Sequence, residues 1–113
     1  MPVLIAVLAD LRALAAVDRD LDRYTLVGGA SVYPFVWSVL LAARDEGLGG
    51  VVTTMVIRRE EEARRLLGAP DHMALAALVA LGHPVHQPTR LKRREVAGFT
   101  TIDRVDGEPF GAG

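Results

Sequence analysis

One helix-forming stretch constrains the fold more than any other segment of this 113-residue chain. Ten of the twelve residues from Val32 to Ala43 are apolar, and they cover every face of a helix. A helix that is apolar all round must be surrounded on all sides. A domain of this size buries only a modest fraction of its surface. We therefore expect a second subunit to cover part of this helix.

The two ends of this helix carry recognisable signals. Ser31 is predicted to cap its start, because a serine hydroxyl can accept a hydrogen bond from an unpaired backbone N–H. Pro34 is tolerated because it falls within the first turn, and Gly47 suits the position just after the helix. The glycines from Gly47 to Gly50 follow a helix and precede a strand. A phosphate-binding loop has the opposite order, so we interpret these glycines as a turn.

Three further segments are predicted to be strands. Pro2–Ala9 is a continuous apolar run, typical of a strand buried on both faces in a parallel or mixed sheet. Val51–Ile57 is rich in β-branched residues and lies between glycines and a charged run. The Ala and Leu content of Met73–Leu81 favours a helix. Its short length between two proline-containing breaks favours a buried strand, which is our prediction.

The charged segments indicate solvated structure. Leu11–Tyr24 alternates in charge and is interpreted as a solvated helix or an irregular connector. Arg59–Leu67 is predicted to be an amphipathic helix ended by Gly68. It has favourable i,i+4 pairs, Glu60–Arg64 and Glu61–Arg65, and its inward-facing residues are predicted to be Ala63, Leu66 and Leu67.

These segments predict a single α+β domain over residues 1–113, with the order β-α-β-α-β and a mixed sheet packed with helices. Residues 84–113 follow as an extended arm, dominated by prolines and charges. Its scattered apolar residues could anchor it across another surface; they are Val96, Phe99, Ile102, Val105 and Phe110.

Composition removes several classes of function. The net charge is −1, from 13 basic and 14 acidic residues, so no charge bias indicates nucleic acid or a membrane surface. There is no cysteine, and the three histidines form no metal-ligand motif. The apolar start lacks basic residues and runs into Asp10, unlike a signal peptide, and the longest apolar stretch is too short to span a membrane. We expect a cytoplasmic location.

Two short motifs could bind a ligand. Thr53 and Thr54 could present hydroxyl and backbone groups to a planar polar ligand at the carboxyl end of a strand, or be ordinary strand threonines. The basic cluster, defined as Arg90, Lys92, Arg93 and Arg94, could converge on a phosphate group, or be a solvated basic stretch. The residues alone leave both alternatives open.

In order and spacing, these motifs resemble the nitroreductase family of FMN proteins over residues 30–96. That family has an apolar helix, Gly-Leu-Gly, a strand with a Thr-Thr pair, a Glu-rich helix ending Leu-Leu-Gly, a strand ending Leu-Gly-x-Pro, and a basic segment. The matching segments here are Leu40–Arg44, Gly47–Gly49, Val52–Thr54, Glu60–Gly68, Leu78–Pro84 and Lys92–Arg94.

The resemblance implies an α+β sandwich that forms an intertwined homodimer with FMN at the subunit interface. NAD(P)H would reduce the flavin, which would then reduce a small acceptor such as a nitroaromatic or quinone-like compound. The flavin supplies the redox chemistry, and the protein binds and orients it. The resemblance assigns the flavin ring to Val52, Thr53, Thr54 and Met55, and the FMN phosphate to Lys92, Arg93 and Arg94. It assigns no catalytic side chain and no metal ligand.

One family feature is absent from the sequence. Members also bind FMN through an early Arg-Ser-x-Arg-type segment, which does not occur here. We therefore expect either a truncated family member that corresponds to the carboxy-terminal half, or a fragment of a longer gene product. Two alternatives belong to other classes of protein. One is a non-catalytic dimerisation or interaction remnant of the family, and the other is a small α/β domain that recognises phosphate through the basic cluster.

Overall fold

The computed structural model describes residues 2–14, 17–23 and 25–111. Within them the chain forms strands and helices in the order β1, α1, β2, α2, β3, which confirms the predicted α+β order. Their bounds are β1 Val3–Asp10, α1 Tyr33–Asp45, β2 Gly49–Thr53, α2 Glu60–Leu67 and β3 Met73–Gly82. Short 3-10 helices lie at η1 Val27–Ser31, η2 Met55–Arg59 and η3 Val96–Gly98.

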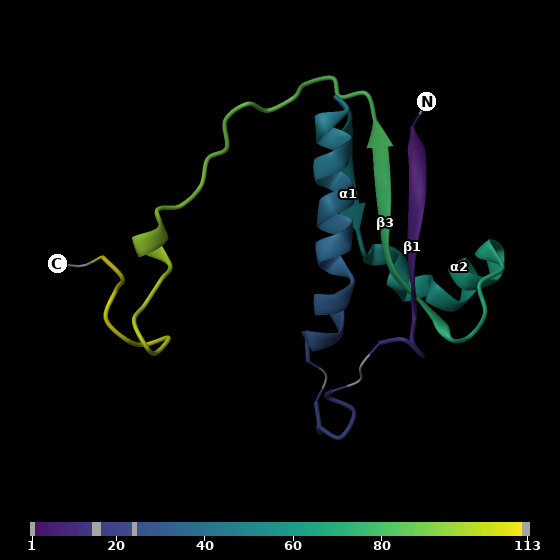
Figure 1. Ribbon diagram of the computed structural model, residues 1–113, viewed down its shortest axis with the longest axis horizontal. Coiled ribbons are helices and arrows are strands. Elements are labelled where there is room, and N and C mark those ends of the chain that lie inside the picture. Colours follow the sequence, from purple (N-terminus) through teal and green to yellow (C-terminus); the bar gives the residue numbers. More distant parts are fainter. Residues whose placement is uncertain (1, 15–16, 24, 112–113) are drawn as a thin grey trace.

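The three strands form one sheet with β3 at its centre, in the order β1-β3-β2 (Figure 1). Both pairings are antiparallel. The predicted strand at Met73–Leu81 is confirmed, because its Ala- and Leu-rich sequence belongs to the most buried strand. Ala77 and Val79 have no exposed surface, and Leu75 is 3% exposed.

A β-bulge interrupts the pairing of β1 with β3. Val7 pairs with Ala77 and Leu8 with Leu75, so Ala76 has no partner across the ladder. The Tyr33 hydroxyl donates a hydrogen bond of 2.9 Å to the Ala76 carbonyl. This bond satisfies an acceptor near the bulge and fixes the start of α1 against β3.

Helix α1 covers one face of the sheet, and the core lies between them (Figure 1). Val36 is 3% exposed and packs with Val7, Ala77 and Val79. Burying a side chain of this kind contributes about 1.5–2 kcal/mol. Small residues in β3 let the helix approach closely. The core is therefore centred on β3 and on the one flank of α1 that faces it.

The other flanks of α1 are exposed in this single chain, so the helix is not surrounded on all sides as its sequence predicts. Phe35 is 60% exposed, Trp37 is 63% exposed and Leu41 is 55% exposed. The expectation that β1 is buried on both faces is also not met. Val7 is buried, but Leu4 is 65% exposed, because β1 is an edge strand and only one face of the sheet carries α1. Covering by a second subunit stays a prediction.

The start of α1 corrects the predicted cap, and its end confirms the predicted glycine. Val32, not Ser31, occupies the N-cap position, and no side chain caps the helix. Ser31 belongs to η1, which ends just before Val32, and the Val32 N–H donates to the Gly29 carbonyl of that turn. At the other end Gly47 has φ of +77°, and the Leu48 N–H reaches the Ala43 carbonyl at 2.8 Å.

Strand β2 is shorter than the predicted Val51–Ile57. It pairs with β3 only from Gly49 to Thr53, and Met55 begins the 3-10 helix η2. The Thr53 hydroxyl accepts a hydrogen bond of 3.3 Å from the Met55 N–H, which favours a turn there. Thr53 pairs with Leu78, and two residues further along β3 its bulge at Ala76 locally increases the twist, so β2 does not continue alongside it. Hence the β-branched residues after Thr53 leave the sheet.

The position of α2 is confirmed, but two predicted inward-facing residues are wrong. Leu66 is 83% exposed and Leu67 is 51% exposed, whereas Ala63 is half-buried. Polar contacts orient this helix. The Glu60 carboxylate accepts a hydrogen bond of 2.8 Å from the Leu75 N–H, and Arg64 forms an ion pair of 3.5 Å with Asp71. The predicted pairing of Glu60 with Arg64 is therefore replaced by two longer-range contacts.

Residues after Gly82 leave the sheet as an arm that first passes the end of α1 at Pro88 and then extends away from it (Figure 1). The radius of gyration is 18.4 Å, against about 13 Å for a compact chain of this length. The arm ends in a small turn closed by the bridge between Thr101 and Pro109. Its predicted anchors are at the surface, with Phe99 61% and Phe110 51% exposed.

The charged segment that precedes α1 is irregular in the residues that the structure describes. Residues 11–14, 17–23 and 25–26 form turns and bends, so the connector interpretation is confirmed for them. The Leu11–Tyr24 prediction also includes residues 15, 16 and 24, which lie outside the described residues.

Candidate functional site

The first predicted ligand-binding group lies where β2 ends. Strand β2 is at an edge of the sheet, so one side of its backbone has no partner strand among the described residues. Met55 is 68% exposed, and Thr53 and Thr54 are also exposed. Thr54 is the residue from which η2 begins, and its carbonyl accepts the Ile57 N–H at 3.1 Å. The site therefore combines free backbone groups with two threonine hydroxyls.

Side chains alternate along β2, which limits how this group can meet a planar ligand. Val52 pairs with Val79 and shares its face with α1, whereas Thr53 pairs with Leu78 and points to the opposite face. Val52 and Thr53 therefore cannot both lay their side chains on one ring. A flat ligand could meet this segment through the backbone edge, with a threonine hydroxyl as an additional partner.

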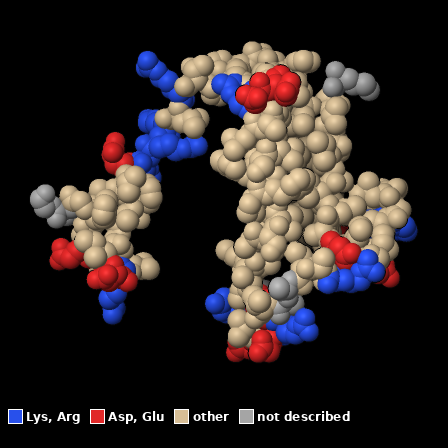
Figure 2. All heavy atoms as spheres, in the orientation of Figure 1, with Lys and Arg blue, Asp and Glu red and all other residues tan. Residues whose placement is uncertain are grey.

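The second predicted group lies on the arm. Lys92 and Arg93 are exposed, and neither makes an ion pair or side-chain hydrogen bond with any described residue. Arg94 differs, because it donates to the Gly98 carbonyl and lies 5.8 Å from the Phe99 ring centre. Lys92 and Arg93 are therefore free to bind an anion, while Arg94 helps to hold the arm in shape. Figure 2 shows blue side chains gathered along this arm beside a mostly uncharged body.

A single copy of the chain keeps the two groups apart. Gly49 pairs with Gly82, the last residue before the arm, whereas Thr53 lies four residues further along β2. Four strand residues span about 14 Å. The arm leaves from the opposite end of β2 and extends away from the sheet (Figure 1). The backbone groups and hydroxyls at the end of β2 suit the polar edge of the FMN ring, and the arm cations suit its phosphate. A single chain does not bring the two groups together.

Sequence reasoning missed a cleft between α1, the start of β2 and the arm. It has a volume of about 550 Å³, and its lining is largely apolar. Arg44 is at its rim, and its guanidinium donates a hydrogen bond of 3.3 Å to the Pro88 carbonyl. The lining includes Trp37 and Leu91, but neither Thr53 nor Lys92. The available signal was Arg44 beside Asp45 at the end of a largely apolar helix.

The resolved pKa shifts belong to exposed ion pairs away from both groups. The Asp10 carboxylate accepts side-chain and backbone hydrogen bonds from Arg12, which lower its pKa from 3.8 to about 2. A side-chain hydrogen bond from Arg104 likewise lowers the pKa of Asp106. Each pair joins residues two apart in the chain, so each stiffens a turn. Neither provides a proton donor or acceptor at the candidate site.

Among the described residues, no group of three or more His, Cys, Asp or Glu side chains could hold a metal ion. None of the helices in the described part of the chain has the length and apolarity needed to cross a bilayer.

Comparison with known proteins gives the class of this protein. The profile of the nitroreductase family matches residues 1–83. The chain is 33% identical over 72 residues to the NADPH-flavin oxidoreductase of Vibrio harveyi. It is also 38% identical over 76 residues to the NADH dehydrogenase of Thermus thermophilus. These stretches cover 64% and 67% of this chain. The chain belongs to the nitroreductase family.

Solved structures show the same fold. The solved structure of B. megaterium NfrA2 has a TM-score of 0.67 at 20% identity, a likeness that concerns the fold alone. The NADPH:FMN oxidoreductase of Vibrio harveyi, solved with NAD⁺, has a TM-score of 0.62 at 28% identity. The comparisons cover 89% and 85% of this chain, respectively.

The matched proteins are longer than this chain. The matches span 30% and 35% of the two curated relatives, and 45% and 43% of the two solved chains. The family match ends at residue 83, so β2 and its threonines lie inside it, and Lys92–Arg94 lie beyond it. The family match therefore supports the binding group at the end of β2 more than the basic cluster on the arm, because only the former lies inside it.

Proposed function

We propose that this chain forms part of an FMN-dependent oxidoreductase that uses NAD(P)H to reduce small acceptors such as nitroaromatic or quinone-like compounds. The observation that carries the proposal is the family match, which includes the open edge of β2. The names of two similar proteins, NADPH-flavin oxidoreductase and NADPH:FMN oxidoreductase, indicate the same chemistry.

Different residues of the chain would bind different parts of FMN. The backbone edge from Val52 to Met55 would contact the ring, with hydrogen bonds from Thr53 or Thr54. Lys92 and Arg93 would neutralise the phosphate, and Arg94 would hold the arm in place. When bound, FMN supplies the capacity to accept a hydride and pass electrons on, whereas these residues bind and orient it.

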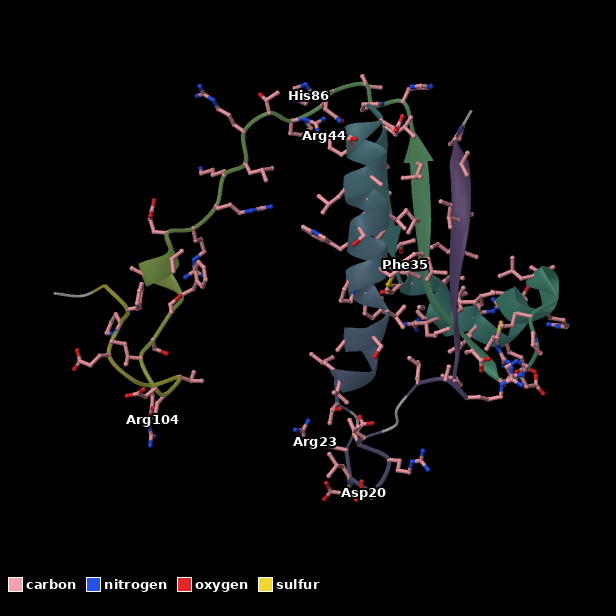
Figure 3. All side chains as sticks on the ribbon, in the orientation of Figure 1. Asp20, Arg23, Phe35, Arg44, His86 and Arg104 are labelled. Carbon is pink, nitrogen blue, oxygen red and sulfur yellow. The ribbon has the colours of Figure 1, made fainter. Side chains whose placement is uncertain are left out.

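We also propose that the working form is a homodimer. One copy separates the β2 edge from the arm cations, so a second copy could supply the missing half of the site. The apolar surface left open on α1 also supports association, because large exposed apolar patches mark interaction sites. Phe35 lies on the flank of α1 opposite the cleft, since it is about 100° from Val36 in the other direction from Trp37. Figure 3 shows Phe35 and Arg44 on different sides of α1.

Binding of FMN to the purified chain tests the flavin proposal directly. We expect FMN fluorescence to be quenched on addition of the chain, with a dissociation constant in the micromolar range. A chain that is folded by circular dichroism yet causes no quenching up to high micromolar FMN would contradict it. That result would favour the alternative, a non-catalytic interaction remnant of the family.

Replacing Phe35 by aspartate is expected to weaken the dimer. Removing an aromatic anchor from the centre of an interface costs about 2 kcal/mol or more, equivalent to about a thirtyfold rise in the dimer dissociation constant. Sedimentation velocity over a range of concentrations measures that constant. Leu26→Asp, at a position that is already 94% exposed, is the matched control and should leave it unchanged. A wild-type chain that stays monomeric throughout would contradict the dimer proposal.

A further inference from the structure

We propose that Tyr33 and Glu60 are positioning residues for the flavin ring, because together they fix where β2 leaves the sheet. Each acts through the central strand β3, by a hydrogen bond to the backbone at its bulge. The flavin part of this inference rests on the proposed function, in which the segment Val52–Met55 contacts the ring. The part that concerns the end of β2 rests on the geometry of the sheet alone.

The register of β2 against β3 shows which residues a longer β2 would meet. Thr53 pairs with Leu78, and each step forward along β2 is a step back along β3. A β2 that followed its β-branched sequence further would therefore place Met55 opposite Ala76 and the next residue opposite Leu75. That pairing does not form, and β3 bulges at Ala76 instead.

Two side chains take backbone groups of β3 at these positions. The Ala76 carbonyl accepts a hydrogen bond of 2.9 Å from the Tyr33 hydroxyl. The Leu75 N–H donates a hydrogen bond of 2.8 Å to the Glu60 carboxylate. Tyr33 is in the first turn of α1 and Glu60 in the first turn of α2. Both helices begin at the same end of the sheet (Figure 1), so they hold the bulge from two directions.

The Leu75 N–H lies on the side of β3 that a longer β2 would occupy. On the β1 side, the His72 carbonyl accepts the Leu11 N–H at 2.9 Å. Backbone groups of successive strand residues point to alternate sides. Leu75 is three residues after His72, so its N–H points away from β1. A backbone N–H has one hydrogen to donate, and the bond to Glu60 leaves none for a longer β2.

The segment after Thr53 turns out of the sheet as a result. The Met55 N–H donates to the Thr53 hydroxyl at 3.3 Å, and the Thr54 carbonyl accepts the Ile57 N–H at 3.1 Å. Met55 is 68% exposed, and Thr54 is also exposed. A β2 that continued to Ile57 would pair part of this backbone with β3. The two side chains therefore determine which backbone groups the segment presents to a flavin ring.

A glycine allows Tyr33 to reach the bulge. A Cβ added to Gly29 would lie 2.7 Å from a ring carbon of Tyr33, which is too close for the ring to stay where it is. A Cβ added to the neighbouring Gly28 would meet no atom within 4 Å. Tyr33 therefore lies against bare backbone, and these two glycines provide a matched pair of sites for a test.

A purely structural role for the two side chains makes a different prediction. If they only attach the helices to the sheet, their removal lowers the free energy of unfolding and leaves the flavin affinity of the folded chain unchanged. A positioning role predicts that this affinity falls, because apparent affinity scales with the fraction of chains in the binding conformation. Ligand affinity of the folded chain therefore separates the two roles.

Titration of Tyr33→Phe with riboflavin and FMN tests the positioning role, because this variant removes only the hydroxyl. We expect both ligands to lose affinity by about threefold to tenfold, the effect of one neutral hydrogen bond. The loss should be equal for the two ligands, because the phosphate-binding cations are unchanged. Ser38→Ala is the matched control. It removes a hydrogen bond of 2.9 Å to the Pro34 carbonyl on the same helix and should change neither affinity.

Further variants alter the same contacts from other directions. Gly29→Ala should displace the Tyr33 ring and reproduce the loss, whereas Gly28→Ala should not. Combining Gly29→Ala with Tyr33→Phe should weaken binding no more than either alone, because both break one hydrogen bond. Glu60→Ala should also weaken both ligands. Glu60→Gln keeps an acceptor for the Leu75 N–H and should restore most of the affinity.

Amide chemical shifts separate failure of this inference from failure of the proposed function. In an isotopically labelled chain, the amide signals of Thr54 to Ile57 should move in Tyr33→Phe and stay in place in Ser38→Ala. If the wild type binds neither flavin while these signals move, the proposed function fails, and the control of the end of β2 by Tyr33 stands. If these signals stay in place, the inference is wrong whether or not FMN binds.

Two binding results would also overturn the positioning role. One is an unchanged riboflavin affinity in a folded Tyr33→Phe chain whose wild type binds FMN, whatever its unfolding midpoint. The other is a loss of affinity for FMN but not for riboflavin, since that pattern belongs to the phosphate. Circular dichroism checks that each variant is folded. If Tyr33→Phe is not, the comparison of Glu60→Ala with Glu60→Gln provides the same test from α2.

Discussion

Replacing Val79 by aspartate is expected to unfold the chain. Val79 has no exposed surface and lies on the central strand, between Ile5 of β1 and Val52 of β2. A carboxyl group at this position would lose its water without gaining a partner, at a cost of several kcal/mol. The total stability of a domain is about 5–15 kcal/mol, and this small open chain is expected to lie near the lower end.

Urea unfolding followed by circular dichroism measures this effect. Val85→Asp is the matched control, because Val85 is fully exposed on the arm, and its unfolding midpoint should equal that of the wild type. A Val79→Asp chain with a cooperative transition near the wild-type midpoint would show that β3 is not the centre of the core. Such a result would contradict the sheet order described above.

Replacing both Lys92 and Arg93 by alanine is expected to weaken FMN binding by about a hundredfold. Each cation would make a charge-assisted hydrogen bond to the phosphate, worth about 1.5–3 kcal/mol. Because the side chains are exposed, the lower end of that range applies. Neither residue makes an ion pair with a described residue, so their removal should leave the fold intact.

Comparing FMN with riboflavin isolates the phosphate contribution. Riboflavin has the same ring but no phosphate, so its affinity should be the same in the wild type and the double variant. A matched control is the double variant Arg58→Ala with Arg65→Ala, which removes two cations far from the arm. If FMN and riboflavin lose affinity equally, Lys92 and Arg93 do not bind the phosphate.

Local signals in the sequence predicted much of the backbone. Gly47 was identified as a helix end because few other residues adopt a positive φ, and the structure places it there. Met73–Leu81 was predicted to be a strand from its length and its flanking breaks, against its helical composition, and it is the central strand. These predictions are correct because backbone conformation and the positions of turns depend on a few neighbouring residues.

Predictions that depended on contacts with distant parts of the chain were less successful. Val51–Ile57 has the composition of a longer strand, but pairing ends at Thr53 because β3 bulges at Ala76. Leu66 and Leu67 were expected to face inward, but Glu60 and Arg64 orient α2 instead. A long-range hydrogen bond and an irregularity in another strand decided both outcomes, and neither can be read from the local pattern.

The candidate site was likewise predicted in part, with its residues identified from the sequence and their arrangement known only from the structure. The sequence identified its two chemical parts, the threonines at the end of β2 and the cations of the arm, because residue type and order carry that information. Only the tertiary structure showed that Val52 and Thr53 face opposite sides of the sheet. It also showed that one copy holds the two parts at opposite ends of β2, and that Arg44 lies at an apolar cleft.

By itself, the sequence of this chain determined the family, the order of the strands and helices, and the chemistry of the candidate binding groups. These properties follow from short-range patterns that each segment carries with it. The tertiary structure decided which flank of α1 is buried, where β2 ends and which groups are neighbours. Those outcomes depend on contacts between residues far apart in the chain, whose free energies exist only once the segments have packed together.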